Sequence, residues 1–354
     1  MAHVLMTGGG TLGPVTPLLA VAAAWRKQDH SVRLSWIGTP SGPEKELIES
    51  AKISFKSLSV PKFDRHRKWK LPFVPLHFIY SCLKAKRLLD ELKPDLVMSA
   101  GAYVSVPIVW MARLKGIPVW IHQLDVVPGL ANKLMARAAT KISVTWEESA
   151  SAFPSKKTQV LGAMARKFIG VGDKSLALER YAFNRYLPTV LVIGGGTGAA
   201  SINELMGVIG SDIVKQANVL HLTGNGKMLD DLNSLGTNYV ALEFLGDGLA
   251  DAYALADVVV ARAGMGTIAE LAALGKAAIL IPMPDSHQVN NAKALHDRQA
   301  AVVLELLTPQ TLLQAIENLL KYPDKRAELE KNIRMIFPLN AEDRIVVEAR
   351  QLIS

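Results

Sequence analysis

One stretch of this chain places a glutamate close behind a glycine turn, a combination that suits a nucleotide. An apolar run at 258–260 is followed by Arg262 and then by the letters AGMGTIAE, which end at Glu270. A helix that begins near Gly266, with Thr267 in its first turn, would present free amides to a diphosphate. Glu270, one turn further along, could accept hydrogen bonds from both hydroxyls of a ribose. An isolated glutamate more often lies on a solvated helix face, so both interpretations stand at this point.

The next apolar run, at 278–281, leads into a polar loop that carries His287 and Gln288. If this run is a parallel strand, the loop lies at its carboxyl end, where open α/β sheets bind their ligands. A histidine-glutamine pair there could hydrogen-bond a sugar. The signal is weak by itself because loops are polar in general.

Two glycine-rich turns, at 8–13 and 194–198, open the two halves of the chain in the same way. Each follows a short apolar run and precedes an amphipathic stretch with helical spacing. Such a turn gathers backbone N–H groups around an anion at a helix N-terminus, where the helix dipole adds about half a positive charge. A chain that repeats this arrangement is expected to hold two nucleotide-binding-type domains.

The glycine spacing would also fit a dinucleotide, but the rest of that motif is missing. A dinucleotide-binding unit needs an acidic residue at the end of its second strand, about 20 residues on, to bind the adenosine ribose. Here residues 37–39 read IGT and residues 222–224 read LTG. No glycine-lysine-serine or glycine-lysine-threonine sequence follows either turn, which excludes an ordinary P-loop.

Short apolar runs alternate with helical stretches along both halves, which predicts an α/β protein with parallel sheets. The expected strands are 4–6, 32–37, 96–98, 119–122, 142–145, 190–193, 219–222, 258–260 and 278–281. A length of 354 residues is typical of two domains, and an apolar content of 49% lets each bury a core. We therefore expect two Rossmann-like, doubly wound domains facing a central cleft. They would span 1–163 and 164–338, with a helix at 339–354 that packs back on the first.

The composition narrows the class of protein. With one cysteine, Cys82, no internal disulfide can form, and the eight histidines are scattered without a pair at metal-ligand spacing, so we expect no metal. No signal peptide precedes the first apolar run, and no run approaches the roughly 18 to 20 apolar residues of a membrane span. We expect a cytoplasmic protein. A net charge of +8 suits an anionic partner, or simply a soluble protein with a basic surface.

One insert combines a cationic cluster, Arg65 to Lys70, with the apolar and aromatic stretch LPFVPLHFIY at 71–80. A protein that rests on an anionic membrane leaflet carries this combination, because the charges attract it and the apolar side chains enter the interface. A basic loop that leads into an ordinary buried helix fits the same letters, and the sequence does not choose between them.

Taken together, these motifs resemble the MurG family of bacterial glycosyltransferases. Its members move N-acetylglucosamine from UDP-N-acetylglucosamine to the undecaprenyl-linked muramyl-pentapeptide, converting lipid I to lipid II. The likeness covers nearly the whole chain, in order: the first glycine turn with Pro17, the letters GAYVSVP at 101–107, the stretch 117–132, the second glycine turn, the 262–270 cluster and the His287-Gln288 loop.

The resemblance implies the GT-B fold, with a first domain that binds the lipid acceptor and the membrane and a second that binds the donor. It implies no cofactor, no nucleic acid partner and a peripheral position on the inner face of the cell membrane. The donor-binding residues would be Arg166, Gly195, Gly196, Thr197, Leu245, Arg262, Met265, Gly266, Thr267, Glu270, His287 and Gln288. The acceptor or its sugar would meet Thr11, Leu12, Gly13, Tyr103 and Asn132.

Within the donor set, the backbone of Leu245 would meet uracil, Glu270 the ribose, the amides from Met265 to Thr267 the diphosphate, and Gln288 the sugar. Where the family commonly has serine, this chain has Gly196. One side-chain contact to phosphate is thereby lost, although the backbone amide can still donate.

The acceptor side departs from the family in the residues expected to carry a proton. Pro14 stands where the family has a histidine, and residues 122–125 read HQLD where the family has HEQN. Neither proline nor glutamine can act as a base, and general-base assistance is typically worth about 100- to 10,000-fold. Our candidate base is Asp125, with His122 as the next candidate. An alternative is that Asp125 only orients the acceptor or a sugar hydroxyl.

The mechanism implied is direct displacement with inversion, in which the acceptor's C4 hydroxyl attacks C1 of N-acetylglucosamine. The helix start near Gly266 would stabilise charge on the departing UDP, an effect worth about 3 to 4 kcal/mol for one well-placed donor. Two rivals remain: a related GT-B transferase with a different lipid or glycan acceptor, and a non-catalytic binder of UDP-sugar.

Overall fold

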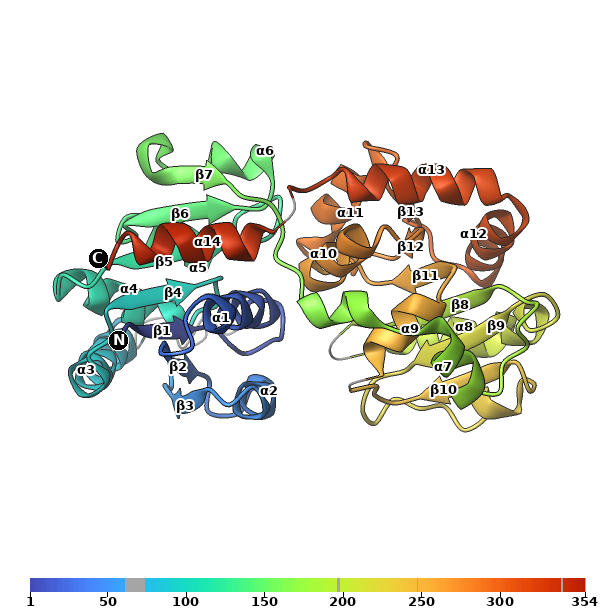
Figure 1. The fold of residues 1–354 in the computed structure, drawn as a ribbon, viewed down its shortest axis with the longest axis horizontal. Coiled ribbons are helices and arrows are strands. Elements are labelled where there is room, and N and C mark those ends of the chain that lie inside the picture. Colours follow the sequence, from blue (N-terminus) through green and yellow to red (C-terminus); the bar gives the residue numbers. More distant parts are fainter. Residues whose placement is uncertain (61–73, 196–197, 247, 339, 354) are drawn as a thin grey trace. The chain divides into compact units, whose positions relative to one another are not determined.

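The computed structural model describes residues 1–60, 74–195, 198–246, 248–338 and 340–353, and the chain divides into two compact units (Figure 1). Unit 1 comprises Met1–Ala165 and Pro338–Ser354, and unit 2 comprises Arg166–Phe337. The divisions expected from the sequence, after residues 163 and 338, lie within two residues of these boundaries.

Unit 1 holds a parallel sheet that, within the described residues, has seven strands in the order β3-β2-β1-β4-β5-β6-β7. Its inner strands are short apolar runs buried on both faces, as is typical of parallel sheets. The order β3-β2-β1-β4-β5 is that of a Rossmann unit. The strands are β1 His3–Thr7, β2 Arg33–Gly38, β3 Ser54–Ser57, β4 Leu96–Ser99, β5 Val119–Gln123, β6 Lys141–Val144 and β7 Thr158–Val160.

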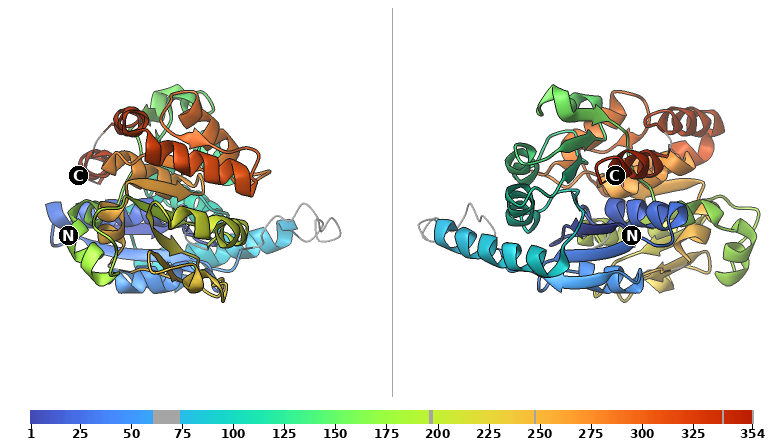
Figure 2. Two further views of the ribbon diagram at one scale, coloured as in Figure 1. Left: turned by 90° about the vertical axis from the view of Figure 1, so that its right-hand side faces the viewer. Right: turned by 60° about the vertical axis from the view of Figure 1, so that its left-hand side comes forward.

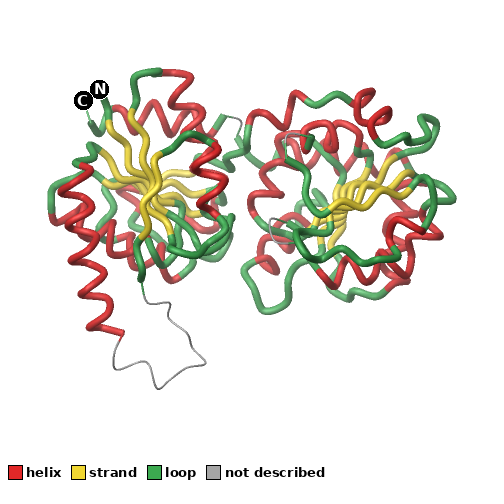
Figure 3. The backbone as a smooth tube through the Cα atoms, turned by 90° about the horizontal axis from the view of Figure 1, so that it is seen from below, coloured by secondary structure: helices red, strands yellow, loops and turns green. Residues whose placement is uncertain are grey.

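Helices cover both faces of this sheet (Figure 3). On one face, α3, α4 and α5 join the main hydrophobic core through residues such as Ala85, Ile108 and Met135. The pair α1 and α14 pack against each other and lie in front of the sheet in Figure 1. The helices are α1 Thr16–Gln28, α2 Glu44–Ser50, α3 Val74–Leu92, α4 Ser105–Leu114, α5 Leu130–Ala136, α6 Glu147–Ala150 and α14 Ala341–Arg350.

Unit 2 repeats the plan with a parallel sheet in the order β10-β9-β8-β11-β12-β13, counted over the described residues. Its core lies between the sheet and the helices α8 and α12. The strands are β8 Thr189–Ile193, β9 Asn218–Leu222, β10 Tyr239–Leu242, β11 Val258–Ala261, β12 Ala278–Leu280 and β13 Val302–Val303. The helices are α7 Lys174–Arg180, α8 Ala200–Ile213, α9 Leu249–Leu255, α10 Met265–Leu274, α11 Gln288–His296, α12 Pro309–Lys321 and α13 Pro323–Arg334.

All nine strands expected from the sequence are present, and the part of the chain that the structure describes holds four more that were not expected: β3, β7, β10 and β13. These four are the edge strands of the two sheets. An edge strand has a neighbour on one side only, and three of these four have no fully buried residue. They therefore lack the continuous apolar run by which the inner strands were recognised.

Candidate active site

The two glycine turns lie at equivalent places in the two sheets. The first follows β1 and the second follows β8, and each of these strands pairs with the strand at which the order reverses, β4 or β11. Open α/β sheets bind ligands at this switch point, outside the carboxyl ends of the strands. Because Ile193 pairs with Ala261, the first residues of the second turn, Gly194 and Gly195, follow β8 beside the segment that leads from β11 to α10.

Strand β11 ends at Ala261, and helix α10 begins at Met265 after a turn of three residues. Gly264 precedes the helix in extended conformation, and its carbonyl accepts the first helical hydrogen bond, from Ile268. Met265, Gly266 and Thr267 thus form the first turn, and the helix itself supplies no carbonyl partner for the amides of Gly266 and Thr267. A Cβ added at Gly264 would meet no described atom within 4 Å. This helix start therefore offers an accessible anion site.

Glu270 is buried in α10 rather than solvated on its surface. Arg166 donates from Nε to its Oε1 at 2.7 Å, and Arg166 Nη2 lies 2.5 Å from the same oxygen. The Tyr253 hydroxyl, from α9, donates to Oε2 at 2.9 Å. A carboxylate has about four lone-pair positions. The arginine takes both positions on Oε1, so one position on Oε2 stays open for a ligand hydroxyl.

Tyr253 is suited to hold this carboxylate in place. Its burial, and then the nearby charge of Glu270, raise the pKa of the Tyr253 hydroxyl well above its ordinary value. The hydroxyl therefore stays protonated and remains a donor. A second ribose hydroxyl could reach the carboxylate only by replacing a bond from Arg166.

Arg262 ties two elements of this edge together. Its Nη1 donates to the carbonyls of Ile281 and Pro282 at 3.2 and 3.3 Å, and its Nη2 donates to Ser201 Oγ, in α8, at 2.7 Å. Burial lowers the pKa of Arg262. The sequence suggested that Arg262 contacts the donor. In the structure its guanidinium binds protein oxygens and so holds the neighbouring segments of the site in place.

His287, Gln288 and Leu245, also expected to bind the donor, follow the carboxyl ends of strands β12 and β10 in the same sheet. Gln288 is the first residue of α11, and its Oε1 accepts from the backbone N–H of Met283 at 3.0 Å. His287, directly before it, is exposed. Leu245 lies in the loop after β10. Its neighbour Phe244 has an exposed side chain, as His287 does.

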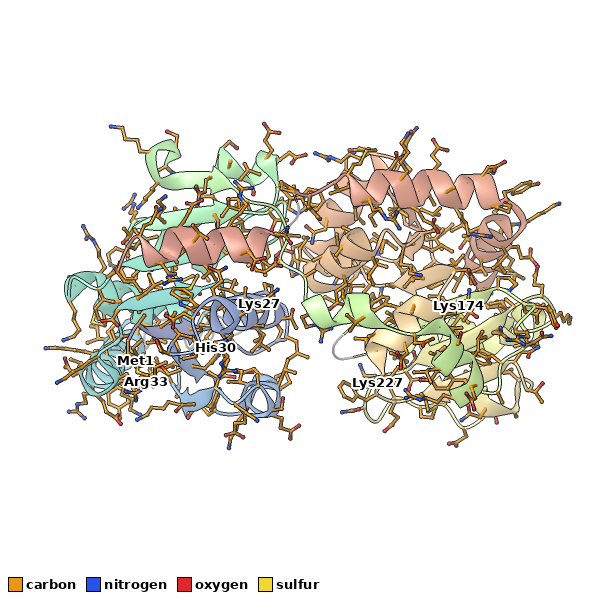
Figure 4. The ribbon with its side chains drawn as sticks, viewed as in Figure 1. Met1, Lys27, His30, Arg33, Lys174 and Lys227 are labelled. Atoms are coloured by element: carbon orange, nitrogen blue, oxygen red, sulfur yellow. The ribbon has the colours of Figure 1, made fainter. Side chains whose placement is uncertain are left out.

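The second glycine turn is open on one side and closely packed on the other. Gly195 has φ +85°, and a Cβ there would meet no described atom within 4 Å. Gly198 has φ +69°, and a Cβ there would lie 2.3 Å from the carbonyl oxygen of Thr223. Lys227, labelled in Figure 4, donates from Nζ to the Gly198 carbonyl at 3.2 Å and brings a positive charge to this turn. Gly196 and Thr197 lie outside the described residues.

A protein carboxylate already contacts the first glycine turn. The amide of Gly10 donates to Glu44 Oε2 at 3.2 Å. The helix that follows starts only at Thr16, after a turn in which Leu12 O accepts from the amide of Thr16 at 3.1 Å. Of the expected acceptor residues here, Thr11 and Gly13 are exposed and Leu12 is half-buried.

Tyr103 lies beside this turn. A Cβ on Gly10 would be 3.3 Å from Tyr103 Cε1. Burial, and then the charge of Glu44, raise the pKa of the Tyr103 hydroxyl. The carboxylate, the turn and the tyrosine therefore form one cluster at the carboxyl end of β1.

A chain of amides fixes the loop that carries Asp125. Asn132 Nδ2 donates to Gln123 Oε1 at 2.6 Å, and Gln123 Nε2 donates to the backbone carbonyl of Asp125 at 2.8 Å. Asn132 is buried, yet its Oδ1 has no hydrogen-bond partner among the described residues. That oxygen lies near Gly101, 3.6 Å from where a Cβ would stand. Gln123 is thus a structural link, while Asp125 is half-buried at the end of the loop.

His122 is placed differently from the role first considered for it. The ring is buried, with Nδ1 2.8 Å from Ser143 Oγ and Nε2 3.0 Å from Thr145 Oγ1. Burial lowers its pKa from 6.5 to about 3, so the ring is neutral. Both nitrogens are bonded to hydroxyls inside the sheet. His122 therefore holds β5 to β6 and does not offer a nitrogen to a substrate, which leaves Asp125 as the candidate base.

Comparisons with known proteins place the chain in a family. Its residues 4–144 match the glycosyltransferase family 28 N-terminal domain, and residues 189–344 match the glycosyltransferase family 28 C-terminal domain. A Lachnospira eligens protein is 37% identical over 92% of this chain and 92% of its own. Its name is UDP-N-acetylglucosamine–N-acetylmuramyl-(pentapeptide) pyrophosphoryl-undecaprenol N-acetylglucosamine transferase. The chain belongs to the MurG family.

Other members of the MurG family agree. A Legionella pneumophila protein of the same name is 35% identical over 97% of this chain and 95% of its own. The crystal structure of Acinetobacter baumannii MurG matches with a TM-score of 0.75 and 27% identity, covering 99% of this chain and all of that one. The two Rossmann-like units are accordingly those of a GT-B glycosyltransferase.

Three side chains at these MurG sites were missed by reasoning from the sequence: Tyr253, Glu44 and Lys227. None belongs to a glycine motif, and each reaches the site from a neighbouring element. Only Glu44 left a sequence signal, since it closely follows the strand next to the first glycine turn. Among the described residues, no group of three or more His, Cys, Asp or Glu side chains is arranged to hold a metal ion.

Proposed function

We propose that this protein is an inverting glycosyltransferase of peptidoglycan synthesis. It moves N-acetylglucosamine from UDP-N-acetylglucosamine to the C4 hydroxyl of undecaprenyl-diphosphate-linked muramyl-pentapeptide, lipid I, and so forms lipid II. Its membership of the MurG family supports this assignment. The observation in the structure that carries it is a buried, oriented carboxylate, Glu270, one turn behind an accessible helix start.

The donor binds to unit 2 in this proposal. The ribose donates to the open lone pair on Glu270 Oε2, and the diphosphate receives hydrogen bonds from the amides of Met265 to Thr267. Those amides stay in place as UDP departs, so they stabilise the charge that grows on the leaving group without reorganising. Gln288, which helix α11 and the Met283 amide hold in position, faces the sugar.

The acceptor binds to unit 1, and Asp125 takes the proton from its C4 hydroxyl. The bond from that oxygen to C1 forms as the bond from C1 to the UDP oxygen breaks, and the C1 configuration inverts. The unpartnered Oδ1 of Asn132 is available to accept a hydrogen bond from the acceptor. This arrangement compensates for Pro14 and Gln123, neither of which can accept the proton.

We further propose that α3 seats the protein on the inner face of the cell membrane. Its side chains Leu76, Ile79, Tyr80 and Leu83 are 67, 57, 57 and 56% exposed and follow the spacing of one helix face. Lys84, Lys86 and Arg87 come directly after them. Figure 2 shows the N-terminal end of α3, in cyan, projecting from its unit. The cationic cluster Arg65 to Lys70 lies outside the described residues, and no described helix is long and apolar enough to cross a bilayer.

The deciding experiment incubates the protein with labelled UDP-N-acetylglucosamine and lipid I and identifies the lipid product. Formation of lipid II supports the proposal. Donor turnover onto another lipid or glycan, but not onto lipid I, would indicate a different acceptor. Binding of UDP-N-acetylglucosamine without turnover on any acceptor would indicate a non-catalytic homologue.

A further inference from the structure

Glu44 is a fully buried carboxylate that the mechanism above does not use. Its exposed fraction is 0%, although it lies in the first turn of α2. Oε1 accepts from both the amide and the hydroxyl of Thr39, at 2.6 Å each, and Oε2 accepts from the amide of Gly10 at 3.2 Å. Burial of a charge is costly unless such donors compensate it. The carboxylate therefore belongs to the architecture of the glycine turn.

The glycines around Glu44 indicate that the turn is built to enclose it. A Cβ on Gly9 would lie 2.0 Å from Glu44 Oε1, and a Cβ on Gly42 would lie 1.9 Å from Oε2. A Cβ on Gly38 would lie 2.9 Å from Oε1. At Gly9 and Gly42 the carboxylate thus occupies the space that a side chain would need, and at Gly38 it shares that space with the Phe55 ring, whose Cε2 would lie 2.7 Å from the added Cβ. A glycine turn of this type usually presents its amides to a ligand anion, but here the chain supplies the anion.

We propose that Glu44 is the resident anion of the first glycine turn. It is a positioning residue that fixes this turn and the neighbouring Tyr103 for the acceptor, and it takes the Gly10 amide that a phosphate would otherwise use. The two glycine turns then have different roles: the second is open to a ligand at Gly195, whereas the first is closed by its own carboxylate. The part of this inference that concerns the acceptor rests on the proposed function.

The first test compares Glu44→Gln with Glu46→Gln, a control in the same turn of α2 whose side chain is exposed. If the glutamine carbonyl accepts from Thr39, as Oε1 does now, its NH2 group takes the place of Oε2 and faces the Gly10 amide. Two donors then face each other and that hydrogen bond is lost. We expect Glu44→Gln to raise KM for lipid I at least tenfold and to leave KM for UDP-N-acetylglucosamine unchanged. A merely structural role would lower kcat and stability without separating the two substrates. An unchanged lipid I KM in a folded Glu44→Gln protein would overturn the proposal.

The second test needs no turnover, so it separates this inference from the proposed function. The Gly10 amide signal is followed by NMR in glycine-labelled protein during titration with inorganic pyrophosphate. We expect no shift in the unaltered protein and a saturable shift in Glu44→Ala, where the amide is free. If Glu44→Ala does not fold, Gly42→Ala displaces the carboxylate from the other side and is expected to give the same shift. A saturable Gly10 shift in the unaltered protein, or none in either folded variant, would refute the resident-anion assignment.

Discussion

Replacement of Glu270 by glutamine is expected to weaken UDP binding through one identifiable hydrogen bond. In the structure, Arg166 directs two donors at Oε1, so the glutamine carbonyl will face the arginine and the NH2 group will take the place of Oε2. Tyr253 can turn its hydroxyl to accept from that NH2 group. The ribose hydroxyl, which donates to the charged Oε2 in our proposal, can then only accept from a neutral NH2 group, so it loses its charge-assisted hydrogen bond.

The magnitude follows from the charge on the lost acceptor. A hydrogen bond to a charged group contributes about 1.5 to 3 kcal/mol, which corresponds to a rise in the Kd for UDP of about 10- to 150-fold. The arginine also loses a charged partner while it keeps an acceptor. A loss of about 2 kcal/mol in the stability of unit 2 would lower its Tm by roughly 4 to 8 °C.

Isothermal titration calorimetry with UDP measures this effect, with Glu204→Gln, an exposed position on α8, as the matched control. UDP analogues that lack one ribose hydroxyl provide the internal check. The unaltered protein should discriminate against at least one of them, and Glu270→Gln should lose that discrimination. A Kd within threefold of the original in a folded Glu270→Gln protein, or unchanged discrimination, would refute the ribose assignment.

Three further predictions concern unit 1. Asp125→Asn should abolish transfer and leave UDP affinity unchanged, as measured by product formation and calorimetry; near-normal turnover would discard Asp125 as the base. Because the pKa of His122 is about 3 in the folded protein and 6.5 ordinarily, the unfolded chain binds the extra proton between these values. The free energy of unfolding should fall as the pH drops from 6.5 toward 3, by up to about 1.4 kcal/mol per pH unit. Urea denaturation of His122→Gln should show a weaker dependence on pH, and an equally steep dependence would contradict this assignment. Ile79→Ser with Leu83→Ser should reduce sedimentation with anionic lipid vesicles at least fivefold without changing UDP affinity, and equal sedimentation would exclude this face of α3.

The inner strands of both sheets could be predicted from the sequence because each contains a run of apolar residues. Strands such as β5 and β11 are buried on both faces; every side chain of β11 is apolar, and β5 begins with three apolar side chains. The edge strands β3 and β7 have no such signature, since one side of each faces no strand. Turn chemistry gave the start of α10 correctly, but it did not reveal that Pro14 and Val15 form a separate turn before α1.

Site residues could be predicted where they belong to one continuous sequence motif. They could not be predicted where they come together through contacts between residues far apart in the chain. Glu270 was recognised by its distance from a glycine turn. Its partners Arg166 and Tyr253 are 104 and 17 residues away in the chain, and nothing in the sequence links the tyrosine to the glutamate. For His122, the sequence showed a titratable ring but not its burial, and burial decides that the ring is a structural link.

The placement of α14 affects how the protein is made. This helix is synthesised after all of unit 2, yet it completes unit 1, where Ile345, Val346 and Ala349 are buried and Glu348 accepts from Lys141 and Gln159. During translation, unit 2 can therefore fold completely before unit 1 does. The surface of α1 that packs against α14 stays exposed until α14 has been synthesised. Unit 2 can thus be completed before unit 1, although unit 1 is translated first, and a nascent chain stalled after unit 2 would carry a complete unit 2 and an incomplete unit 1.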